Sequence, residues 1–407
     1  MEEKHMILCS DNLITGDGIT LVKDGAICIS QDGKIRAVGT KADIIKQYPN
    51  EQITDYGNAT ILPGLFDMHV HLGYYYSQPD LYNYDDYLVS YYALKQAELA
   101  LSLGITTVRD LSSPHNLCKQ LRTAGEKGYA TIPRIFHSDT GMCMTGGHGH
   151  DDGIPQVDSP WGVRKEVRAQ IRDGADWIKI LTSNRTSIPE YTQEELNAAV
   201  DETHRVGKKC AVHAGLQPAL QMCIDAGFDT IEHGTLLTLE QVEQMARQGQ
   251  VWVPTMTAYT VLYEFCLEKI KEGADTSNRI AQKAMTDMAF FEPAYHAYKD
   301  NFKTFYDTGV TIVAGSDMVL YGAPPLPINR ELSLMVDYGI TPIQAIQTAT
   351  GNSAKVLGIE ELTGQLKEGL EADLLIVDGN AADDITALNQ LKEVYMKGKV
   401  VYQGSNI

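Results

Sequence analysis

Short apolar segments alternate with longer amphipathic segments through the middle of the chain. Eight apolar segments have the length and β-branched content of strands, and helical stretches such as 91–103 and 193–206 lie between them. The eight candidate strands are 61–71, 106–111, 134–138, 177–181, 210–214, 230–234, 251–255 and 311–316. This alternation predicts an α/β protein, and eight repeats within 62–355 predict a (β/α)8 TIM barrel.

Both ends of the chain have a different pattern, in which short β-forming segments are separated by turns. Asp-Gly pairs begin at Asp17, Asp24 and Asp32, and such pairs mark tight turns. We therefore predict that 1–61 and 356–407 together form a small β-sandwich domain beside the barrel of 62–355. The weakly patterned stretch 260–300 predicts one long barrel helix with an insertion.

The net charge limits the kinds of binding partner that we expect, and the cysteine content indicates the cellular compartment. Lys and Arg number 34 and Asp and Glu 53, which gives a net charge of −19. An acidic surface repels phosphate backbones and anionic lipid, so nucleic acid and membrane are excluded as expected partners. The seven cysteines are odd in number and have no CxxC spacing. They predict free thiols in a cytoplasmic protein and argue against a thiolate metal site.

Polar residues at the ends of the predicted strands are the candidates for chemistry, because barrel active sites lie at the carboxyl ends of strands. His69 and His71 are two positions apart, so a strand directs both rings to the same side, where they can bind a divalent metal. Lys179 lies within an apolar strand, where a lysine needs a partner. The alternative for Lys179 is that its amine reaches the barrel rim.

Three further candidates end later strands. His213 and His233 each precede a glycine within two positions. A lone histidine at such a place is more often a satisfied polar residue, but two on successive strands, in a chain with a His-X-His pair, favour metal ligands. Asp317 follows the last strand, where a carboxylate can bind a metal and accept a proton. Its alternative role is to cap the next helix.

This set of strand-end residues resembles the amidohydrolase superfamily, and the resemblance covers essentially the whole chain. It implies a hydrolase with two divalent metal ions, most often zinc, and a homo-oligomer. It implies that His69, His71 and Asp317 hold the more buried metal and that His213 and His233 hold the more exposed one.

The same resemblance explains the buried lysine and suggests a mechanism. It implies that Lys179 reacts with CO2 to give a carbamate that bridges both metals. A metal-bound hydroxide would then attack the carbonyl of an amide, and Asp317 would act first as general base and then as general acid.

Smaller motifs resemble the imidazolonepropionase-related branch, which contains zinc Xaa-Pro dipeptidases of the prolidase kind and arginine carboxypeptidases. They are Thr-Gly-Gly-His-Gly-His at 145–150, Glu-His-Gly-Thr at 232–235 and Val-Pro-Thr-Met-Thr-Ala-Tyr at 253–259. The resemblance implies that His148 contacts the substrate carbonyl and that Tyr259 lines the pocket. A surface turn around His148 and an ordinary packed aromatic at Tyr259 are the alternatives.

The expected substrate is a small molecule with an amide bond, either a dipeptide or an N-acyl amino acid. Arg185 follows Lys179 in a loop and is a candidate clamp for a substrate carboxylate, or else a solvated loop residue. A cyclic amidase, a heterocycle deaminase and an imidazolonepropionase-type hydrolase are the enzymatic alternatives. Lys179 counts against the deaminases, which usually lack a bridging lysine, and the full ligand set counts against an inactive scaffold.

Overall fold

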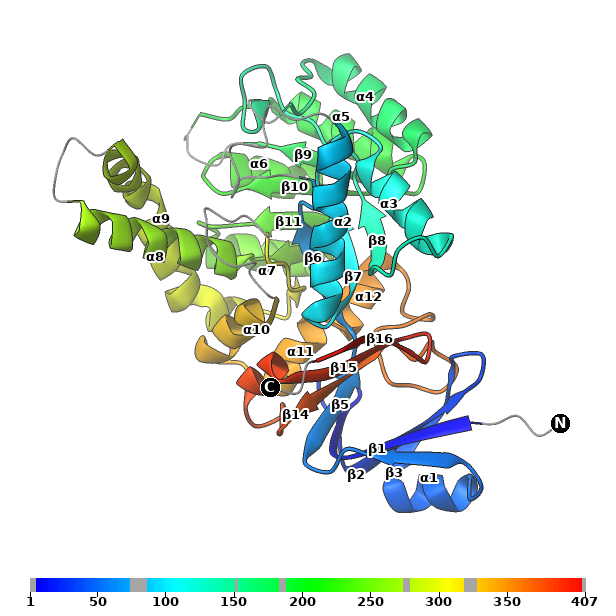
Figure 1. The fold of residues 1–407 in the computed structure, drawn as a ribbon. Coiled ribbons are helices and arrows are strands. Elements are labelled where there is room, and N and C mark those ends of the chain that lie inside the picture. Colours follow the sequence, from blue (N-terminus) through cyan, green and yellow to red (C-terminus); the bar gives the residue numbers. More distant parts are fainter. Residues whose placement is uncertain are drawn as a thin grey trace.

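The protein is described here from a computed structural model of residues 5–73, 86–150, 153–182, 188–273, 279–317 and 328–404. Two parallel sheets form its centre (Figure 1). The smaller consists of β6 (Leu65–Val70), β7 (Ile105–Asp110) and β8 (Arg134–His137). The larger consists, in spatial order, of β13 (Thr311–Ile312), β12 (Val251–Val253), β11 (Thr230–His233), β10 (Lys209–Ala214) and β9 (Trp177–Leu181). The prediction of an α/β fold with parallel strands is confirmed.

Backbone hydrogen bonds link the outer strands of the two parallel sheets at both junctions. Met142, beyond β8, donates its N–H to the carbonyl of Lys179 on β9 at 3.0 Å. At the other junction Asp317 donates its N–H to the carbonyl of His69 at 2.8 Å. The carboxyl ends of strands from both sheets therefore meet at one edge, where the candidate residues lie.

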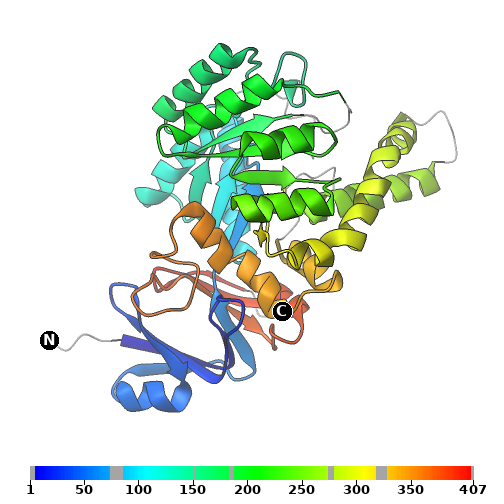
Figure 2. The ribbon, with the colours of Figure 1, turned by 180° about the vertical axis from the view of Figure 1, so that it is seen from behind.

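Helices cover the parallel strands, as Figure 2 shows for the green helices that lie side by side on the outside. Their bounds are α2 (Asp86–Ser102), α3 (Leu117–Glu126), α4 (Pro160–Asp173), α5 (Gln193–His204), α6 (Ala219–Ala226), α7 (Leu239–Gln248), α10 (Ile328–Asp337), α11 (Pro342–Thr348) and α12 (Gly351–Leu357). Capping boxes begin α5, α7 and α11 at Thr192, Thr238 and Thr341. Each threonine accepts a backbone N–H that would otherwise lack a partner. Across the described ranges, no helix combines the length and the apolar character that crossing a bilayer would need.

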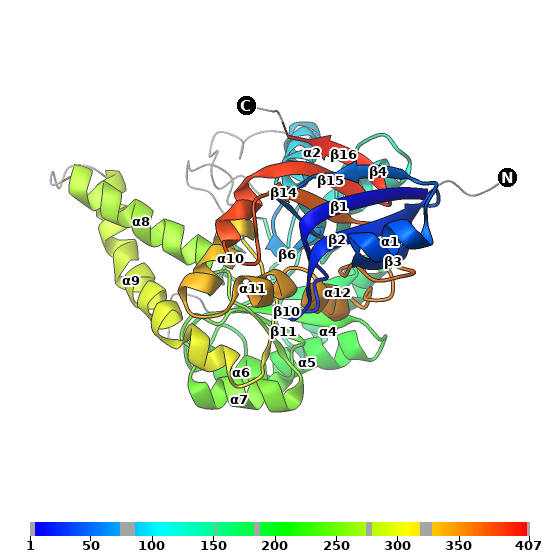
Figure 3. The ribbon, with the colours of Figure 1, turned by 90° about the horizontal axis from the view of Figure 1, so that it is seen from below.

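Two helices occupy the stretch for which one long helix was predicted. α8 (Met256–Glu272) ends at Gly273, and α9 (Arg279–Tyr306) returns along it. The pair projects from the rest of the molecule in Figure 3. The prediction of a single helix was wrong because Gly273, which disfavours a helix interior, ends the first one.

Strands from both chain ends form one sheet of eight strands. They are β1 (His5–Ile14), β2 (Leu21–Ser30), β3 (Ile35–Thr40), β4 (Gln52–Asp55), β5 (Ala59–Pro63), β14 (Leu374–Asp378), β15 (Leu391–Met396) and β16 (Lys399–Gln403). Their order is β16-β15-β14-β5-β1-β2-β3, with β4 beside β1, and Figure 1 shows the blue and red strands together. The helix α1 (Lys41–Gln47) and the 3-10 helix η3 (Ile385–Asn389) accompany them. The two chain ends thus share one sheet, whereas a sandwich requires two.

The predicted strand 61–71 is divided between two sheets. β5 pairs with β14 in the sheet of the chain ends, and β6 belongs to the parallel strands. The break falls at Gly64, where an added Cβ would lie 2.3 Å from Oγ1 of Thr106. Glycine therefore allows the chain to pass close to β7 as it enters the parallel sheets.

Candidate metal centre

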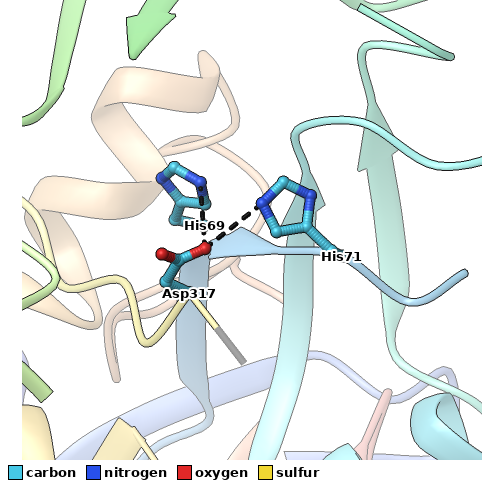
Figure 4. A group of neighbouring side chains, drawn as sticks. All are labelled: His69, His71 and Asp317. Atoms are coloured by element: carbon cyan, nitrogen blue, oxygen red, sulfur yellow. Dashed lines mark ion pairs between the residues drawn. The ribbon is translucent and has the colours of Figure 1, made fainter. Parts of the chain in front are cut away.

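His69, His71 and Asp317 form a compact group at the carboxyl edge of the parallel strands. The Nε2 atoms of His69 and His71 lie 3.5 and 3.2 Å from Oδ1 of Asp317. Figure 4 shows both rings directed at this one oxygen. Two imidazole nitrogens and a carboxylate oxygen within 4.8 Å of one another can hold a divalent metal.

The backbone explains why these three side chains meet. Strand alternation directs His69, on β6, and His71, directly after β6, to the same side. Asp317 has a φ of 64°, and its N–H bond to His69 fixes the turn that carries its carboxylate. An added Cβ at Gly315 would lie 2.8 Å from Cβ of His69. Glycine at 315 thus lets the last strand come close enough for Asp317 to reach the histidines.

Three more histidines lie beside this group. His213 and His233 are at the ends of the neighbouring strands β10 and β11, with ring centres 4.3 Å apart. The ring of His233 lies 5.0 Å from that of His69, and the ring of His148 lies 4.2 Å from that of His213. His233 is oriented by a hydrogen bond of 2.7 Å between its Nδ1 and Oγ1 of Thr255. The structure therefore brings all the histidines selected from the sequence into one cluster.

Lys179 is buried on β9 near the same cluster. Its Nζ has no hydrogen-bond partner among the described residues, and neither has Nε2 of His213. Burial lowers the pKa of Lys179 to about 8, against the opposing effect of Glu232 and Asp317. Buried polar atoms without partners are costly, and a bound metal or a modified amine would give both of these atoms a partner. The residues present therefore fit a divalent metal site.

The protonation states of His69, His213, His233 and Asp317 also suit metal ligands, whereas at His71 burial is outweighed by the hydrogen bond to Asp317 and the charge of that residue, which raise the pKa. Burial lowers the pKa of His69 and His213 well below the ordinary value, and it lowers the pKa of His233 to about 3. Although burial opposes it, the nearby His69, His71 and His233 hold the pKa of Asp317 below its usual range. Neutral imidazoles with free lone pairs and an ionised carboxylate are the forms that bind metals.

An ion pair missed by the sequence analysis supports His69. Glu232 Oε2 lies 2.8 Å from Nδ1 of His69, and Glu232 Oε1 accepts a hydrogen bond of 2.8 Å from Nη2 of Arg109. All three side chains are buried. Because the ring of His69 is neutral, a proton on Nδ1 for this bond leaves Nε2 free for a metal. Arg109 could have been selected from the sequence, because it is a charged residue within a predicted strand, as Lys179 is.

The other predicted site residues differ in how far the structure describes them. His148 donates its backbone N–H to Oε2 of Glu190 at 3.0 Å. Tyr259 is buried on α8, with its ring centre 5.6 Å from that of His233. His148 thus belongs to the histidine cluster, and Tyr259 lies beside it. Arg185 lies outside the described residues.

Comparisons with known proteins find similar sequences and structures. The sequence profile of the "Amidohydrolase family" matches residues 60–401. The ochratoxinase of Aspergillus niger is 31% identical over all of this chain and 88% of its own length. The enamidase of Eubacterium barkeri is 24% identical over 94% of this chain and 89% of its own. The crystal structure of a Xaa-Pro dipeptidase with methionine bound in its active site has a TM-score of 0.85 and 28% identity, covering 98% of this chain and 100% of that one.

Proposed function

Because this chain belongs to the amidohydrolase family, we propose that it hydrolyses the amide bond of a dipeptide or an N-acyl amino acid at a binuclear metal centre. Its similarity to these relatives shows that it is a hydrolase that acts on carbon–nitrogen bonds. One observation carries the binuclear proposal. The atoms Lys179 Nζ and His213 Nε2 are buried beside the His69, His71 and Asp317 group and have no hydrogen-bond partner among the residues that the structure describes.

The proposed ligands divide into two sets. His69, His71 and Asp317 would hold one divalent metal, and His213 and His233 would hold the other, with zinc as the proposed ion for both. Lys179 is the proposed bridge, as a carbamate formed with CO2. Its lowered pKa supports this role, because only a neutral amine attacks CO2.

We propose that the two parallel sheets act as one (β/α)8 barrel of 62–355, with the β strands of 1–61 and 356–407 as the second domain. The hydrogen bonds at both junctions of the parallel sheets support this assignment. The proposed enzyme is a cytoplasmic homo-oligomer with a small-molecule substrate. Seven buried thiols suit a reducing compartment.

The residues of this chain have distinct parts in the proposed reaction. Metal ions, when bound by these residues, would supply an acidified water and would polarise the substrate carbonyl. Asp317 accepts the proton of the attacking water and passes it to the leaving nitrogen. His148 donates a hydrogen bond to the carbonyl oxygen as negative charge develops there. Glu232 holds the ring of His69 in one tautomer and one orientation.

The proposed substrate has a free carboxylate. The proposed substrate class is supported by the similarity of this chain to a Xaa-Pro dipeptidase. Arg185 is the proposed partner of that carboxylate, because a guanidinium matches a carboxylate in bidentate fashion. In a chain with a net charge of −19, an anionic substrate needs a local cation of this kind. Tyr259 is proposed to line the pocket next to His233.

The test is a screen of dipeptides and N-acyl amino acids by ninhydrin detection, together with metal analysis. We expect about two metals per chain and faster turnover of a dipeptide than of its C-terminal amide. Arg185→Ala should remove that preference. Equal turnover of acid and amide would contradict the carboxylate. Opening of a cyclic amide or deamination of a heterocycle, without dipeptide turnover, would assign the alternative activity.

A further inference from the structure

A second group of metal-ligating side chains lies at the opposite end of the strands from the His69 cluster. His204 is the last residue of α5, Cys210 is near the start of β10, and Asp229 directly precedes β11. His213 is near the other end of β10, and at about 3.3 Å per residue it lies roughly 10 Å along the strand from Cys210. The group therefore shares no ligand with the proposed catalytic centre.

The three ligand atoms are close together. His204 Nε2 lies 2.8 Å from Oδ2 of Asp229, and Cys210 Sγ lies 3.5 Å from the same oxygen and 3.9 Å from His204 Nε2. Tetrahedral zinc, with bonds of about 2.3 Å to sulfur and about 2.0–2.1 Å to nitrogen or oxygen, sets its ligand atoms about 3.3–3.6 Å apart. A small opening of the His204–Asp229 contact and a small shortening of the distance between Cys210 Sγ and His204 Nε2 would bring all three separations close to these values.

We propose that His204, Cys210 and Asp229 bind a divalent cation with affinity for sulfur, with Zn²⁺ as the expected ion. One histidine, one thiolate and one carboxylate form a borderline-soft set that suits Zn²⁺ better than Mg²⁺ or Ca²⁺. A water occupies the fourth position. The ion ties the end of α5 to the starts of two neighbouring strands.

Burial and access both suit such an ion. Cys210 is buried, while the side chains of His204 and Asp229 are 42% and 26% exposed. The cation can therefore enter from solvent and keep its water. Asp229 Oδ2 also accepts the backbone N–H of Cys210 at 2.8 Å. The carboxylate is thus held in place before any metal arrives, which reduces the ordering that binding requires.

The charge balance follows from the hydrogen bond that the thiol already makes. Cys210 donates its S–H to Asp229 Oδ2, and a cation would take the position of that proton, which is released to solvent. The thiolate and the carboxylate then neutralise the two charges of the ion.

This group could not be recognised from the sequence, because its residues are far apart along the chain. Its members are at positions 204, 210 and 229, so they form no CxxC or His-X-His pair that the sequence alone would reveal. The expectation that the cysteines form no thiolate metal site rested on their odd number and on the absence of CxxC spacing. The fold brings these positions together because β10 and β11 are neighbouring parallel strands and α5 ends beside them.

Cobalt substitution tests the proposal on the full-length protein. Co²⁺ bound to a thiolate gives a charge-transfer band in the near ultraviolet, and the proposed catalytic ligands include no cysteine. We expect a band that saturates at one thiolate-bound Co²⁺ per chain and disappears when Zn²⁺ is added. Cys210→Ser should abolish the band. His204→Ala should weaken Co²⁺ binding at least tenfold. Cys223→Ser, which changes a buried cysteine of α6, is the matched control and should keep the band.

Two further variants separate loss of the proposed site from misfolding and from loss of the catalytic centre. His204 is partly exposed, so His204→Ala should fold normally by circular dichroism even if Cys210→Ser does not. His69→Ala should keep the band, which separates this site from the proposed function. Absence of the band in folded wild type, or full retention of it in His204→Ala, would overturn the proposal and leave the three residues as a hydrogen-bonded group.

Discussion

Nδ1 of His69 lies 2.8 Å from a carboxylate oxygen of Glu232, and both side chains are buried. The other oxygen of Glu232 contacts Arg109, whose guanidinium also donates from Nε to the carbonyl of Met68 at 2.7 Å. A predicted metal ligand is therefore connected to a buried ion pair and to the backbone of its own strand. This connection predicts that metal binding and stability depend on the same carboxylate.

Glu232→Gln should weaken both properties. Loss of the carboxylate beside His69 should lower metal affinity by about 10–100-fold, the usual effect of such a partner. Arg109 would keep its buried charge without a counter-charge, and we expect the free energy of unfolding to fall by about 3–5 kcal/mol. Competition with a chelator measures the first effect and urea unfolding the second.

Thr230→Val is the matched control for Glu232→Gln. Thr230 donates its hydroxyl to Glu232 and accepts a hydrogen bond of 3.2 Å from Arg109, and neither bond involves His69. This near-isosteric change should reduce stability and leave metal affinity nearly unaltered. Equal metal affinity in Glu232→Gln and wild type would show that the carboxylate does not orient His69.

Lys179→Ala should lose metal and activity together. The amine is buried among the proposed ligands, and its Nζ finds no hydrogen-bond partner in the described parts of the chain. Removal of a bridging ligand should abolish full metal occupancy, measured by elemental analysis, and a short-chain carboxylic acid should restore part of the activity. Lys165→Ala, an exposed change on α4, is the control. Unchanged metal content and rate in Lys179→Ala would exclude the bridge.

Asp317→Asn should reduce kcat by at least ~10²-fold, the lower range for lost acid–base catalysis. The amide keeps the shape and one acceptor oxygen but cannot accept the proton of the attacking water. Steady-state kinetics at saturating metal separates this loss from weaker metal binding. A near-normal kcat would contradict acid–base catalysis by Asp317 and would indicate that this residue has a structural role at the end of the last strand.

His148→Ala should reduce kcat by about 10²–10³-fold, as expected when a donor to a developing oxyanion is removed. Metal content should stay at the wild-type value, because His148 is proposed to contact substrate and not metal. His150→Ala, in the same loop, is the control for disturbance of the loop. Loss of metal in His148→Ala would instead make this histidine a ligand.

Stability at low pH should depend on Glu202. Hydrogen bonds from Arg168, with further bonds from Arg205 and Arg164, hold the pKa of this buried carboxyl at about 2. An unfolded glutamate titrates near about 4.3, so this contribution is complete above that pH and is lost as the pH falls towards 2. The difference in Tm between wild type and Glu202→Gln should shrink over this interval. Glu240→Gln, an exposed change on α7, should show no such trend.

Strand-end residues could be predicted from sequence because strand alternation is local. His69 and His71 need only their spacing, and Lys179 stands out because its neighbours Ile178 and Ile180 are apolar. The register of these residues is fixed by the buried face of each strand. The sequence therefore indicated the metal candidates without any knowledge of which strands are neighbours.

Contacts between distant segments could not be predicted in the same way. Glu232 pairs with Arg109 across 123 positions, and nothing near either residue indicates the other. The division of 61–71 between two sheets depends on the close approach of Gly64 to Thr106, which no apolar pattern encodes. Such features follow from the packing of segments that are far apart in the chain.

The sheet built from both chain ends sets the order in which the protein can fold during synthesis. Thr60 donates its hydroxyl to the carbonyl of Gly379, 319 positions later, at the place where β5 meets β14. At about 5–20 residues per second, a ribosome takes roughly 15–60 s to deliver that partner. During this interval β5 has an open edge on the nascent chain, and open strand edges invite pairing with other chains. The time of greatest risk of aggregation therefore falls during translation, before the last strands have left the ribosome.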